Sequence, residues 1–518
     1  MIFAALCRMA RQPVLVLAHR EELVQQACDK IGHALGDPGQ VGIEQASLRA
    51  DSGVKVVVAS IRSLRSERLA ALRQRFAFGL VIYDECHHAP ADDNVRVLRE
   101  LGCLDPDWSG TLLGVTATTQ RGDGKGLDGV FERVVYFQTL PDLIAQQWLA
   151  PLRGYRIATS ADLSAVRPVG EDLDLEALAD AVDIEERNAL VARSIQELAR
   201  DRRTIAFCVT VAHAQNLALA LRKLGVRAGV VHGELPRLQR ADVLAAFRQQ
   251  QLQVVCNVAV LTEGFDDPGV SCIAMARPTR SPGLYAQCVG RGTRLYEGKR
   301  DCLVLDFVDV SSLDLCALPA LYGMPRQLDL QGERADEAAG KWQRIAFDHE
   351  GFELEAAGIT LDEVQQRAAA FDPLTRAVDP EVRALSPLAW VSLGLHGLAL
   401  HVQFRPGQVA ELAVRPVAKR GKRWAVVWEG TEKARFSTME EAVTAVDWEV
   451  EQRGPKAWQS ALPTADWRQD SVPVALRDAL EAVRSPRRAQ TVGEALHLLA
   501  LSAAVRRQAL PAKSPKAT

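Results

Sequence analysis

The sequence predicts an α/β protein with two successive parallel-sheet domains, followed by a C-terminal α+β region. Three observations support this fold class. Short β-branched segments alternate with helix-like segments from Pro13 to about Pro151, and a second series of the same kind ends near Cys316. Beyond Lys341 the alternation is absent, although seven of the nine tryptophans of the chain lie there.

The size and composition restrict the number of domains and the class of protein. The chain has 518 residues and a mass of 56.6 kDa, more than one hydrophobic core normally supports. Hydrophobic residues make up 48% and charged residues 25%, as in soluble globular proteins. With a net charge of -3, any site for a polyanion must be a local patch.

Cysteines and apolar stretches indicate a cytoplasmic protein. Ten cysteines lie between Cys7 and Cys316 without a C-x-x-C pair, and we expect them to be buried and reduced. The apolar opening "MIFAALC" has no preceding basic residue, so we interpret it as a buried helix. The stretch "LAWVSLGLHGLALHV" is too short to cross a bilayer.

Four strands are expected in the first series. They are "PVLVLAH", "VKVVVAS", "LVIYDE" and "TLLGVTAT", separated by helix-like segments such as "REELVQQACDKIGHAL". Each strand ends in small, polar or charged residues, which is typical of parallel βα units with chemistry at the carboxyl ends of the strands.

A polar segment separates the two series. We predict that "YRIATSADLSAVRPVGEDLDL" is an irregular linker. The second series then contains the expected strands "RTIAFCV", "RAGVVHG", "LQVVCNVAV", "VSCIAMA" and "DCLVLDFV". The predicted divisions are a first domain over 1–150, a linker over 151–184, a second domain over 185–325 and an accessory region over 326–518.

In the accessory region one hairpin and one helix are expected. The segment "AELAVRPVAKRGKRWAVVWEG" predicts a β-hairpin with a basic turn, and "STMEEAVTAVDWEVEQR" predicts a helix capped by Ser437 or Thr438. Two interpretations of the turn stay open. Its basic side chains and the nearby tryptophans could grip DNA, or the tryptophans could be core residues beside a solvated turn. The residues concerned are Lys419, Arg420, Lys422, Arg423, Trp424 and Trp428.

The segment "LVIYDECHHA" carries the sharpest chemical signal. A buried strand delivers Asp84 and Glu85 together to its polar end. In nucleotide hydrolases, the first acid of such a pair orients magnesium and the second positions or deprotonates the attacking water. An Asp-Glu pair in a solvated turn is the alternative.

Two further segments point to phosphate chemistry. In "YAQCVGRGTRL", Gln287, Arg291 and Arg294 are spaced to share one helix face, where two guanidiniums without a nearby acid suit an external anion. A solvated basic face would give the same spacing. In "VLTEGFDDPGV", the residues from Thr262 to Asp266 predict a turn that allows close backbone approach.

Together these segments resemble the superfamily 2 helicases and translocases of the DEAD/DEAH type, with a DECH box. Seven motifs occur in the expected order over roughly residues 1 to 315. They are "LAHREEL" (Ia), "VVVASIRSL" (Ib), "DECH" (II), "GVTATTQR" (III), "TIAFCVTVAHA" (IV), "LTEGFDDPGV" (V) and "QCVGRGTR" (VI). The segments "DECHHA" and "TATTQRGDGKGL" are most similar to the bacterial DNA-repair and restriction-type motors.

The resemblance implies two RecA-like domains, the first N-terminally incomplete, with ATP and Mg²⁺ between them and DNA as the partner. Asp84 would hold the metal, Glu85 would be the general base, and His87 would link the nucleotide and nucleic-acid sites. Gln287, Arg291 and Arg294 would act from the second domain. Gly264 and Asp266 would contact nucleotide, and Thr116 and Thr118 would couple hydrolysis to domain motion. The backbone of one strand would be held by Arg20, Ser60, Thr210 and Thr262.

The family's P-loop, G-x-x-x-x-G-K-[ST], does not occur in the 518 residues. In "RGDGKGLDG", Lys125 is followed by Gly126, so no hydroxyl is available for magnesium. "IFAALCRMARQ" matches the helix that follows a P-loop. Three explanations stay open: a start codon assigned too late, a truncated gene, or an ATPase-inactive binding subunit. Because a central strand would then be missing, we expect this chain to aggregate or to need a partner.

Three functions are compatible with these residues. The first is an ATP-dependent DNA helicase or translocase in repair or recombination. The second is a DNA-binding or scaffold protein built on a helicase remnant, and the third is the motor subunit of a restriction system.

Overall fold

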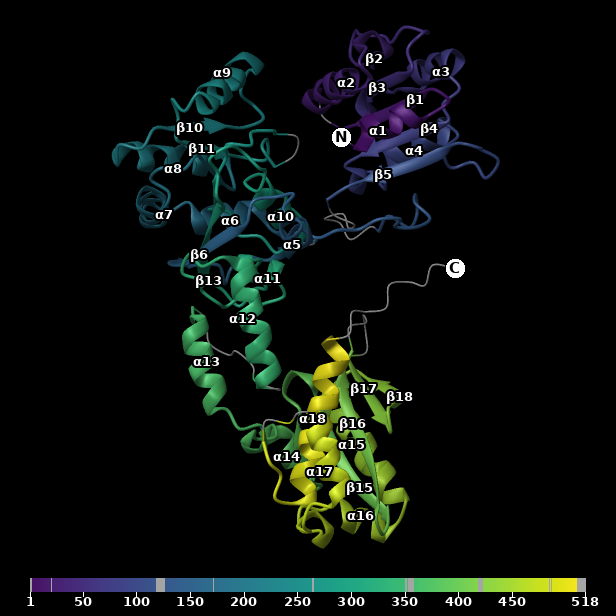
Figure 1. Ribbon diagram of the computed structural model, residues 1–518, viewed down its shortest axis with the longest axis vertical. Helices are drawn as coiled ribbons and strands as arrows, with labels where there is room; N and C mark the ends of the chain where they lie inside the picture. Colours follow the sequence, from purple (N-terminus) through teal and green to yellow (C-terminus); the bar gives the residue numbers. More distant parts are fainter. Residues whose placement is uncertain are drawn as a thin grey trace. The chain divides into compact units, whose positions relative to one another are not determined.

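The structure is a computed structural model (Figure 1). It describes residues 2–19, 21–117, 126–170, 172–262, 265–349, 352, 358–417, 423–483, 485 and 487–509. The chain divides into two compact units, Met1–Glu337 and Ala338–Thr518. The first unit contains two parallel sheets and the second an antiparallel sheet with helices, so the predicted fold class is confirmed.

The first lobe of the first unit is a parallel sheet of five strands in the order β2-β3-β1-β4-β5. The four strands expected from the sequence are β1, β3, β4 and β5, and β2 is an additional edge strand. The lobe contains α1 (Ile2–Met9), β1 (Val14–Ala18), α2 (Glu21–Leu35), η1 (Pro38–Gln40), β2 (Val41–Glu44), β3 (Val56–Ser60), η2 (Ile61–Ser63), α3 (Ser66–Arg75), β4 (Leu80–Asp84), η3 (Cys86–His88), α4 (Asp92–Glu100) and β5 (Thr111–Val115).

Side-chain alternation along β1 explains why this lobe has three layers. Val14 and Val16 belong to a buried cluster with α1 and α2. Leu15 and Leu17 belong to a second cluster, with α3 and α4, on the opposite face. All five β1 side chains are buried, because a parallel strand covered on both faces needs apolar residues at every position.

The second lobe is a parallel sheet of six strands in the order β10-β11-β9-β12-β13-β6. Its helices α7 and α8 pack on one face, through Val191, Ile195, Leu217 and Leu221. The elements are α5 (Leu140–Ala145), β6 (Leu152–Asp162), β7 (Pro168–Val169), β8 (Asp172–Leu173), α6 (Leu175–Val182), α7 (Glu185–Leu198), β9 (Thr204–Phe207), α8 (Val211–Lys223), β10 (Ala228–Val231), α9 (Arg237–Arg248), β11 (Val254–Asn257), β12 (Cys272–Met275), α10 (Pro282–Gly290), β13 (Cys302–Val310) and α11 (Leu318–Leu321).

The expected irregular linker over 151–184 is wrong in its first part, because β6 lies there. This strand pairs with β13, with Leu152 opposite Cys302 and Ile157 opposite Phe307. Its polar residues bond to neighbouring elements: Arg153 Nε lies 2.9 Å from an oxygen of Asp301. An edge strand carries such polar side chains, and these gave the segment the composition of a linker.

The second unit is built around an antiparallel sheet in the order β14-β15-β16-β17-β18. Helix α15 packs on one face of this sheet and α18 on the other. The elements are α12 (Ala335–Asp348), which begins in the first unit, α13 (Leu361–Ala370), η4 (Pro373–Thr375), α14 (Pro380–Leu385), β14 (Val391–Ser392), η5 (Gly394–His396), β15 (Leu398–Arg405), β16 (Gln408–Pro416), β17 (Trp424–Trp428), β18 (Thr431–Phe436), α15 (Met439–Gln452), α16 (Pro455–Ala461), η6 (Asp466–Arg468), α17 (Val474–Ala482) and α18 (Val492–Ala509).

The expected hairpin and helix of this unit are present. Strand β16 pairs with β17, with Leu412 opposite Trp428. Thr438 caps α15 in a capping box with Glu441. Trp424 and Trp428 are half-buried against the core beneath α15, which agrees with their interpretation as core residues. Lys419, Arg420 and Lys422 of the basic turn lie outside the described residues.

The ten cysteines are free, as expected. Eight are buried, and Cys28 and Cys316 are half-buried. Among the described residues, no helix combines the length and apolarity that a membrane crossing needs.

An exposed apolar segment lies beyond β5 in the chain. Val134, Val135, Tyr136 and Phe137 are 67%, 67%, 72% and 68% exposed, and residues 132–138 belong to no helix or strand. Strand β5 is one of the two edge strands of the first sheet, and its side chains are less buried than those of β1 and β3. Four consecutive exposed β-prone residues, in a lobe that also has an edge strand, favour self-association.

We therefore predict that the 518-residue chain self-associates through this segment. Replacing Val135 and Phe137 together by Lys should increase the monomer fraction in sedimentation velocity, because like charges oppose strand pairing. The control is Val169→Lys, at a valine 58% exposed in β7, which should change nothing. A monomeric wild-type chain would contradict the prediction.

A buried ion pair joins the helical layer of the second lobe to its sheet. Arg187 and Asp309 are both fully buried, and the Arg187 guanidinium donates to the two carboxylate oxygens at 2.7 and 3.0 Å. Arg187 also donates to the carbonyl of Ala276 at 2.9 Å. The arginine therefore ties the start of α7 to the ends of β12 and β13.

Replacing Arg187 by Met should lower the free energy of unfolding by about 3 to 5 kcal/mol, because it leaves the Asp309 carboxylate buried without its partner. Urea unfolding of the full chain measures this loss. The double variant Arg187→Met with Asp309→Leu should recover part of it. Equal losses in the single and double variants would argue against the ion pair as the cause.

Candidate functional site

Asp84 and Glu85 lie at the carboxyl edge of the first sheet. Strand β4 is buried through Val81, Ile82 and Tyr83 and ends at Asp84, whose side chain is half-buried. The carboxylate of Asp84 accepts the backbone N–H of Glu85 at 3.2 Å. The sheet therefore holds one carboxylate rigidly and presents the next residue just beyond it.

Glu85 has an unusual backbone conformation. Its φ of 51° lies in the left-handed region, which side chains other than glycine seldom adopt. Such local strain is maintained by its surroundings and is concentrated at functional sites. The conformation ends β4 abruptly and begins the 3-10 turn η3, which carries His87 and His88.

His87 connects this strand end to that of β5. It is 8% exposed, and its Nδ1 lies 2.9 Å from Oγ1 of Thr116. The same nitrogen lies 3.5 Å from a carboxylate oxygen of Glu85. The structure thus brings together three of the predicted residues, Glu85, His87 and Thr116.

The close approach of these two strand ends depends on Gly114 in β5. A Cβ atom there would lie 2.6 Å from the ring of Phe131 and 2.7 Å from the sulfur of Cys86. A side chain at this position would therefore displace Phe131 or Cys86, and Cys86 is the first residue of η3.

Ser60 ends β3 at the same edge and is buried, with Ala18 of β1 directly opposite it. Three other predicted site residues, Arg20, Thr118 and Gly264, lie outside the described residues.

In the second lobe, the segment from Thr262 to Asp266 holds the two predicted arginines. Arg291 donates from Nε to the carbonyl of Thr262 and from Nη1 to that of Phe265, both at 3.0 Å. Arg294 Nε lies 3.1 Å from an oxygen of Asp266. The sequence predicted no acid nearby on the helix face of these arginines, and Asp266, from a separate segment of the chain, pairs with Arg294.

The three residues Gln287, Arg291 and Arg294 also do not share one helix. Helix α10 ends at Gly290, and the next residues form a tighter turn in which Arg291 N–H bonds to Cys288 and Gly292 N–H to Val289. Gly292 fits closely here, because a Cβ atom would lie 2.3 Å from the sulfur of Cys302. Gln287 is half-buried on α10 itself.

Thr210 lies at the carboxyl end of β9 and caps α8. Its hydroxyl oxygen accepts the backbone N–H of His213 at 3.2 Å. A helix N-terminus with a hydroxyl cap is a suitable position for a phosphate.

Sequence reasoning missed Lys299, which fastens the loops around the arginines. Its ammonium group donates to the carbonyl of Arg294 at 2.8 Å and to that of Pro268 at 3.2 Å. Burial lowers the pKa of Lys299 to about 8. A lone lysine in "YEGKRD" has no sequence signal for this role, because its partners are backbone carbonyls.

Sequence reasoning also missed the anchor of α10. The Tyr285 hydroxyl donates to the carboxylate of Asp306 in β13, at 2.8 and 2.9 Å from its two oxygens. Burial raises the pKa of Asp306 to about 6. These two residues belong to separate parts of the sequence, and only the packing of α10 on the sheet brings them together.

The described side chains of the first lobe do not form a complete magnesium site. They could hold the ion if a bound nucleotide supplied further oxygen ligands. Among the described residues, no three His, Cys, Asp or Glu side chains form a metal-binding group. Mg²⁺ commonly takes only one or two carboxylates and fills its other positions with water and phosphate oxygens. Asp84 fits that requirement, whereas the 518 residues include no P-loop for the phosphates.

His213 is held neutral next to the predicted phosphate position. Its ring is buried, and Nδ1 accepts the backbone N–H of Val209 at 3.3 Å. Burial, assisted by the charge of Arg187, lowers the pKa of His213 to about 4. An unfolded chain has a histidine pKa of about 6.5, so unfolding takes up a proton between these values.

We predict that this contribution to stability is present above pH 6.5 and is lost as the pH falls toward 4. His213→Gln lacks the titration, so the stability advantage of the wild type over the variant should shrink by about 2 kcal/mol between pH 7 and pH 5. Urea unfolding at the two pH values measures the change. His33→Gln, at an exposed histidine of α2, is the control, and a constant difference for His213→Gln would contradict the prediction.

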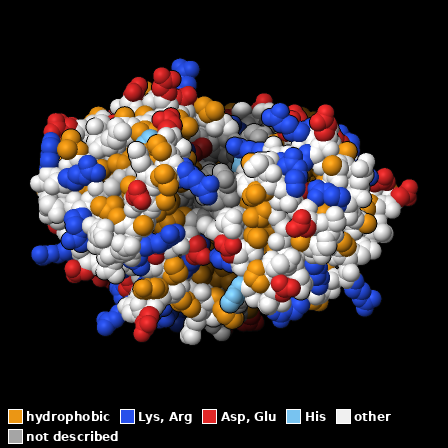
Figure 2. Space-filling view, turned by 90° about the horizontal axis from the view of Figure 1, so that it is seen from above, with side chains coloured by type: hydrophobic (Ala, Val, Ile, Leu, Met, Phe, Trp, Pro, Cys, Tyr) orange, Lys and Arg blue, Asp and Glu red, His pale blue; other side chains and the backbone are white. Residues whose placement is uncertain are grey.

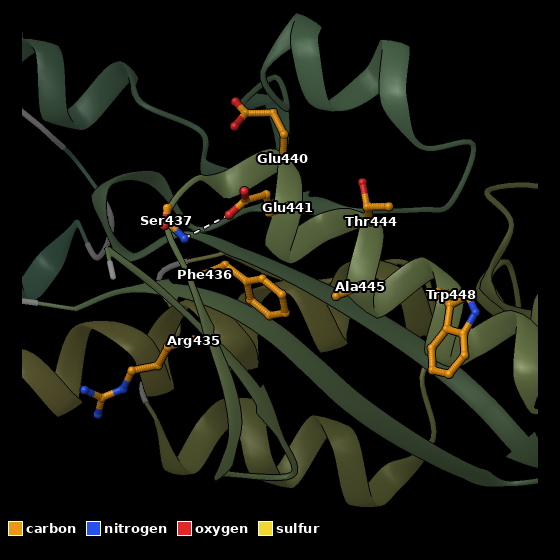
Figure 3. A pocket seen from close by; sticks show the side chains of 8 residues that line it. All are labelled: Arg435, Phe436, Ser437, Glu440, Glu441, Thr444, Ala445 and Trp448. Atoms are coloured by element: carbon orange, nitrogen blue, oxygen red, sulfur yellow. Dashed lines mark hydrogen bonds between the residues drawn. The ribbon is translucent and has the colours of Figure 1, made fainter. Parts of the chain in front are cut away.

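A groove of about 900 Å³ lies apart from these residues, in the second unit. Phe436, Ala445 and the 59% exposed Trp448 line it, together with Glu440 and Glu441 at the start of α15 (Figure 3). It contains none of the motif residues and is not part of the candidate catalytic site. Figure 2 shows one face of the molecule, on which Lys and Arg side chains are interspersed with Asp and Glu.

Two family models match the two lobes. Residues 1–121 match the family described as type III restriction enzyme, res subunit, and residues 186–296 match the helicase conserved C-terminal domain. The two lobes are therefore similar, each through its own family model, to the paired domains of helicases and restriction enzymes.

Curated relatives agree with this assignment. The chain is 36% identical over 324 residues to irc3 of Schizosaccharomyces pombe, named as a candidate mitochondrial ATP-dependent helicase, which covers 62% of this chain and 53% of that protein. It is 29% identical over 314 residues to IRC3 of Saccharomyces cerevisiae, named as a candidate ATP-dependent helicase, covering 60% and 45%. A type I restriction enzyme EcoAI endonuclease subunit of Escherichia coli is 27% identical over 264 residues, covering 46% and 32%. The chain thus spans about half the length of the first two relatives.

Proposed function

We propose that the protein is an ATP-dependent DNA helicase or translocase that acts in DNA repair or recombination. The observation that carries this proposal is the carboxyl edge of the first sheet. There Asp84 is fixed at the end of a buried strand, and the left-handed backbone of Glu85 sets its carboxylate 3.5 Å from Nδ1 of His87.

In the first lobe, Asp84 would hold Mg²⁺ through water and Glu85 would take the proton of the attacking water. Bound ATP with Mg²⁺ would supply the phosphoryl group and the charge neutralisation that hydrolysis needs. His87, through its contact with Thr116, would transmit a structural change at this site to the end of β5. Thr116 and Thr118 would couple hydrolysis to domain motion.

In the second lobe, Arg291 and Arg294 would stabilise the charge of the transferred phosphoryl group. Their bonds to Thr262, Phe265 and Asp266 support a mechanism in which this loop sets their positions. Gly264 and Asp266 would contact the nucleotide, and Gln287 would act from α10. The proposed first domain remains 1–150, whereas the proposed second domain, given first as 185–325, has to include β6 from Leu152.

The nucleic acid would be held by its phosphates. Ser60 and Arg20 would contact one strand from the first lobe, and Thr210 and Thr262 from the second. Such contacts fix the position of the strand and carry no sequence information. A hydroxyl at the N-terminus of α8 supports this role for Thr210. We propose a cytoplasmic location, while one relative is named as mitochondrial.

A restriction motor is a second candidate function. The match of residues 1–121 to the type III restriction res subunit, and the EcoAI subunit among the relatives, favour it. Co-purification with a nuclease or methyltransferase subunit would distinguish this function from a repair helicase. A DNA-binding scaffold is the third candidate, for which DNA affinity without ATP binding would be expected.

The test is ATP hydrolysis by the protein purified from its native source, with and without DNA. Intact mass spectrometry of the same preparation compares its mass with 56.6 kDa. We expect hydrolysis that DNA stimulates. Absence of ATP binding, with DNA binding retained, would replace the enzyme by the scaffold.

Glu85→Gln should reduce the rate of hydrolysis by about 10²- to 10⁴-fold, because the amide cannot accept the water proton. ATP and DNA dissociation constants should be unchanged. The matched control is Glu67→Gln, at an exposed position of α3, which should hydrolyse ATP at the wild-type rate. Wild-type turnover in Glu85→Gln would exclude the proposed base.

A further inference from the structure

A continuous row of side chains crosses the carboxyl edge of the first sheet. Arg62 Nη2 lies 2.8 Å from Nε2 of His19. The His19 ring stacks on that of His88, with centroids 4.6 Å apart and planes inclined by 21°. His88 in turn contacts the His87 ring at 4.0 Å, and His87 reaches Thr116.

The order of the strands produces this row. Arg62 follows β3, His19 follows β1, His87 and His88 follow β4, and Thr116 follows β5. These four strands are successive neighbours in the sheet. One end of the row is two residues from Ser60, the proposed phosphate contact, and the other end is at the proposed catalytic site.

The backbone of His88 is bonded directly to the catalytic turn. Its N–H donates to the carbonyl of Glu85 at 3.0 Å, and its own carbonyl accepts from Asn94 Nδ2 at 2.8 Å. A displacement of the His88 ring would therefore move a residue whose hydrogen bond helps to hold Glu85 in its left-handed conformation.

Arg62 is suited to sense the nucleic acid. Its side chain is exposed, and a guanidinium has five N–H donors in a planar fork that fits phosphate. A phosphate held near Ser60 would compete with or reorient the bond from Arg62 to His19. The stacked imidazoles would then pass this change to His88.

We propose that His19 and His88 are positioning residues that couple nucleic-acid binding to ATP hydrolysis at Glu85. The proposal rests on the proposed function and goes beyond it. It names the side chains through which DNA would stimulate the enzyme. The stack supplies coupling through contact between two rigid strand ends, and it needs no movement of the sheet itself.

The experiment measures the steady-state rate of ATP hydrolysis by the native protein, without DNA and with saturating single-stranded DNA. The variants are His88→Ala, His19→Ala, His88→Phe and the double alanine variant. His33→Ala, at an exposed histidine of α2, is the matched control. DNA affinity is measured in parallel by fluorescence anisotropy.

The DNA stimulation is the ratio of the rates with and without DNA. In His19→Ala and His88→Ala we expect this ratio to fall by about fivefold or more, a typical size for coupling between sites. The rate without DNA should fall by a smaller factor than the stimulated rate, because the backbone hydrogen bond from His88 to Glu85 remains in both variants. DNA affinity should stay at the wild-type value. His88→Phe, which keeps a ring in the stack, should retain more stimulation than His88→Ala. The double variant should lose no more than either single variant, because both interrupt one row.

Full stimulation in His88→Ala would overturn the coupling role. An equal loss of the basal and the stimulated rate would also overturn it, because that is the result of a purely structural defect. If the wild type hydrolyses no ATP under either condition, the proposed function fails and the coupling fails with it.

Discussion

The in-register pairing of parallel strands in the first sheet is the constraint on which the proposed site depends. Leu17 of β1 lies opposite Ala59 of β3 on one side and Tyr83 of β4 on the other. Because the strands start level, they also end level, and the residues that follow them meet along one edge. Burial of both faces of the sheet prevents a slip in register, since a shift by one residue would exchange the side chains of two different cores.

In the second lobe, contacts with a separate segment of the chain hold two positively charged side chains in place. These arginines lie just beyond the end of α10. Thr262 and Phe265 supply carbonyls to Arg291, and Asp266 supplies a carboxylate to Arg294. Lys299 then joins the carbonyl of Pro268, just beyond Asp266 in the chain, to that of Arg294. Backbone carbonyls therefore set the direction of the Arg291 guanidinium, and the Asp266 carboxylate sets that of Arg294.

Much of this arrangement could be predicted from the sequence. The β-branched segments identified nine strands of the two lobes, because strands buried on both faces are apolar throughout and end at polar residues. Asp84, His87 and Thr116 lie at strand ends as expected. Three features could not be predicted. The left-handed conformation of Glu85 depends on its neighbours in space, the end of α10 at Gly290 depends on tight packing of Gly292, and the partners of Lys299 are backbone atoms.

The position of β6 affects how the protein can be divided for study. Residues 151–184 have the composition of a linker, so the sequence alone would place the start of a second-lobe fragment within or after them. A fragment that began at residue 185 would lack β6, including Leu152 and Gly154. One edge of β13 would then have no partner strand. The buried carboxylate of Asp309 would also lose the hydroxyl of Thr159. The second lobe is therefore a domain whose first strand lies outside its apparent sequence boundary, and a separable fragment has to begin before Leu152.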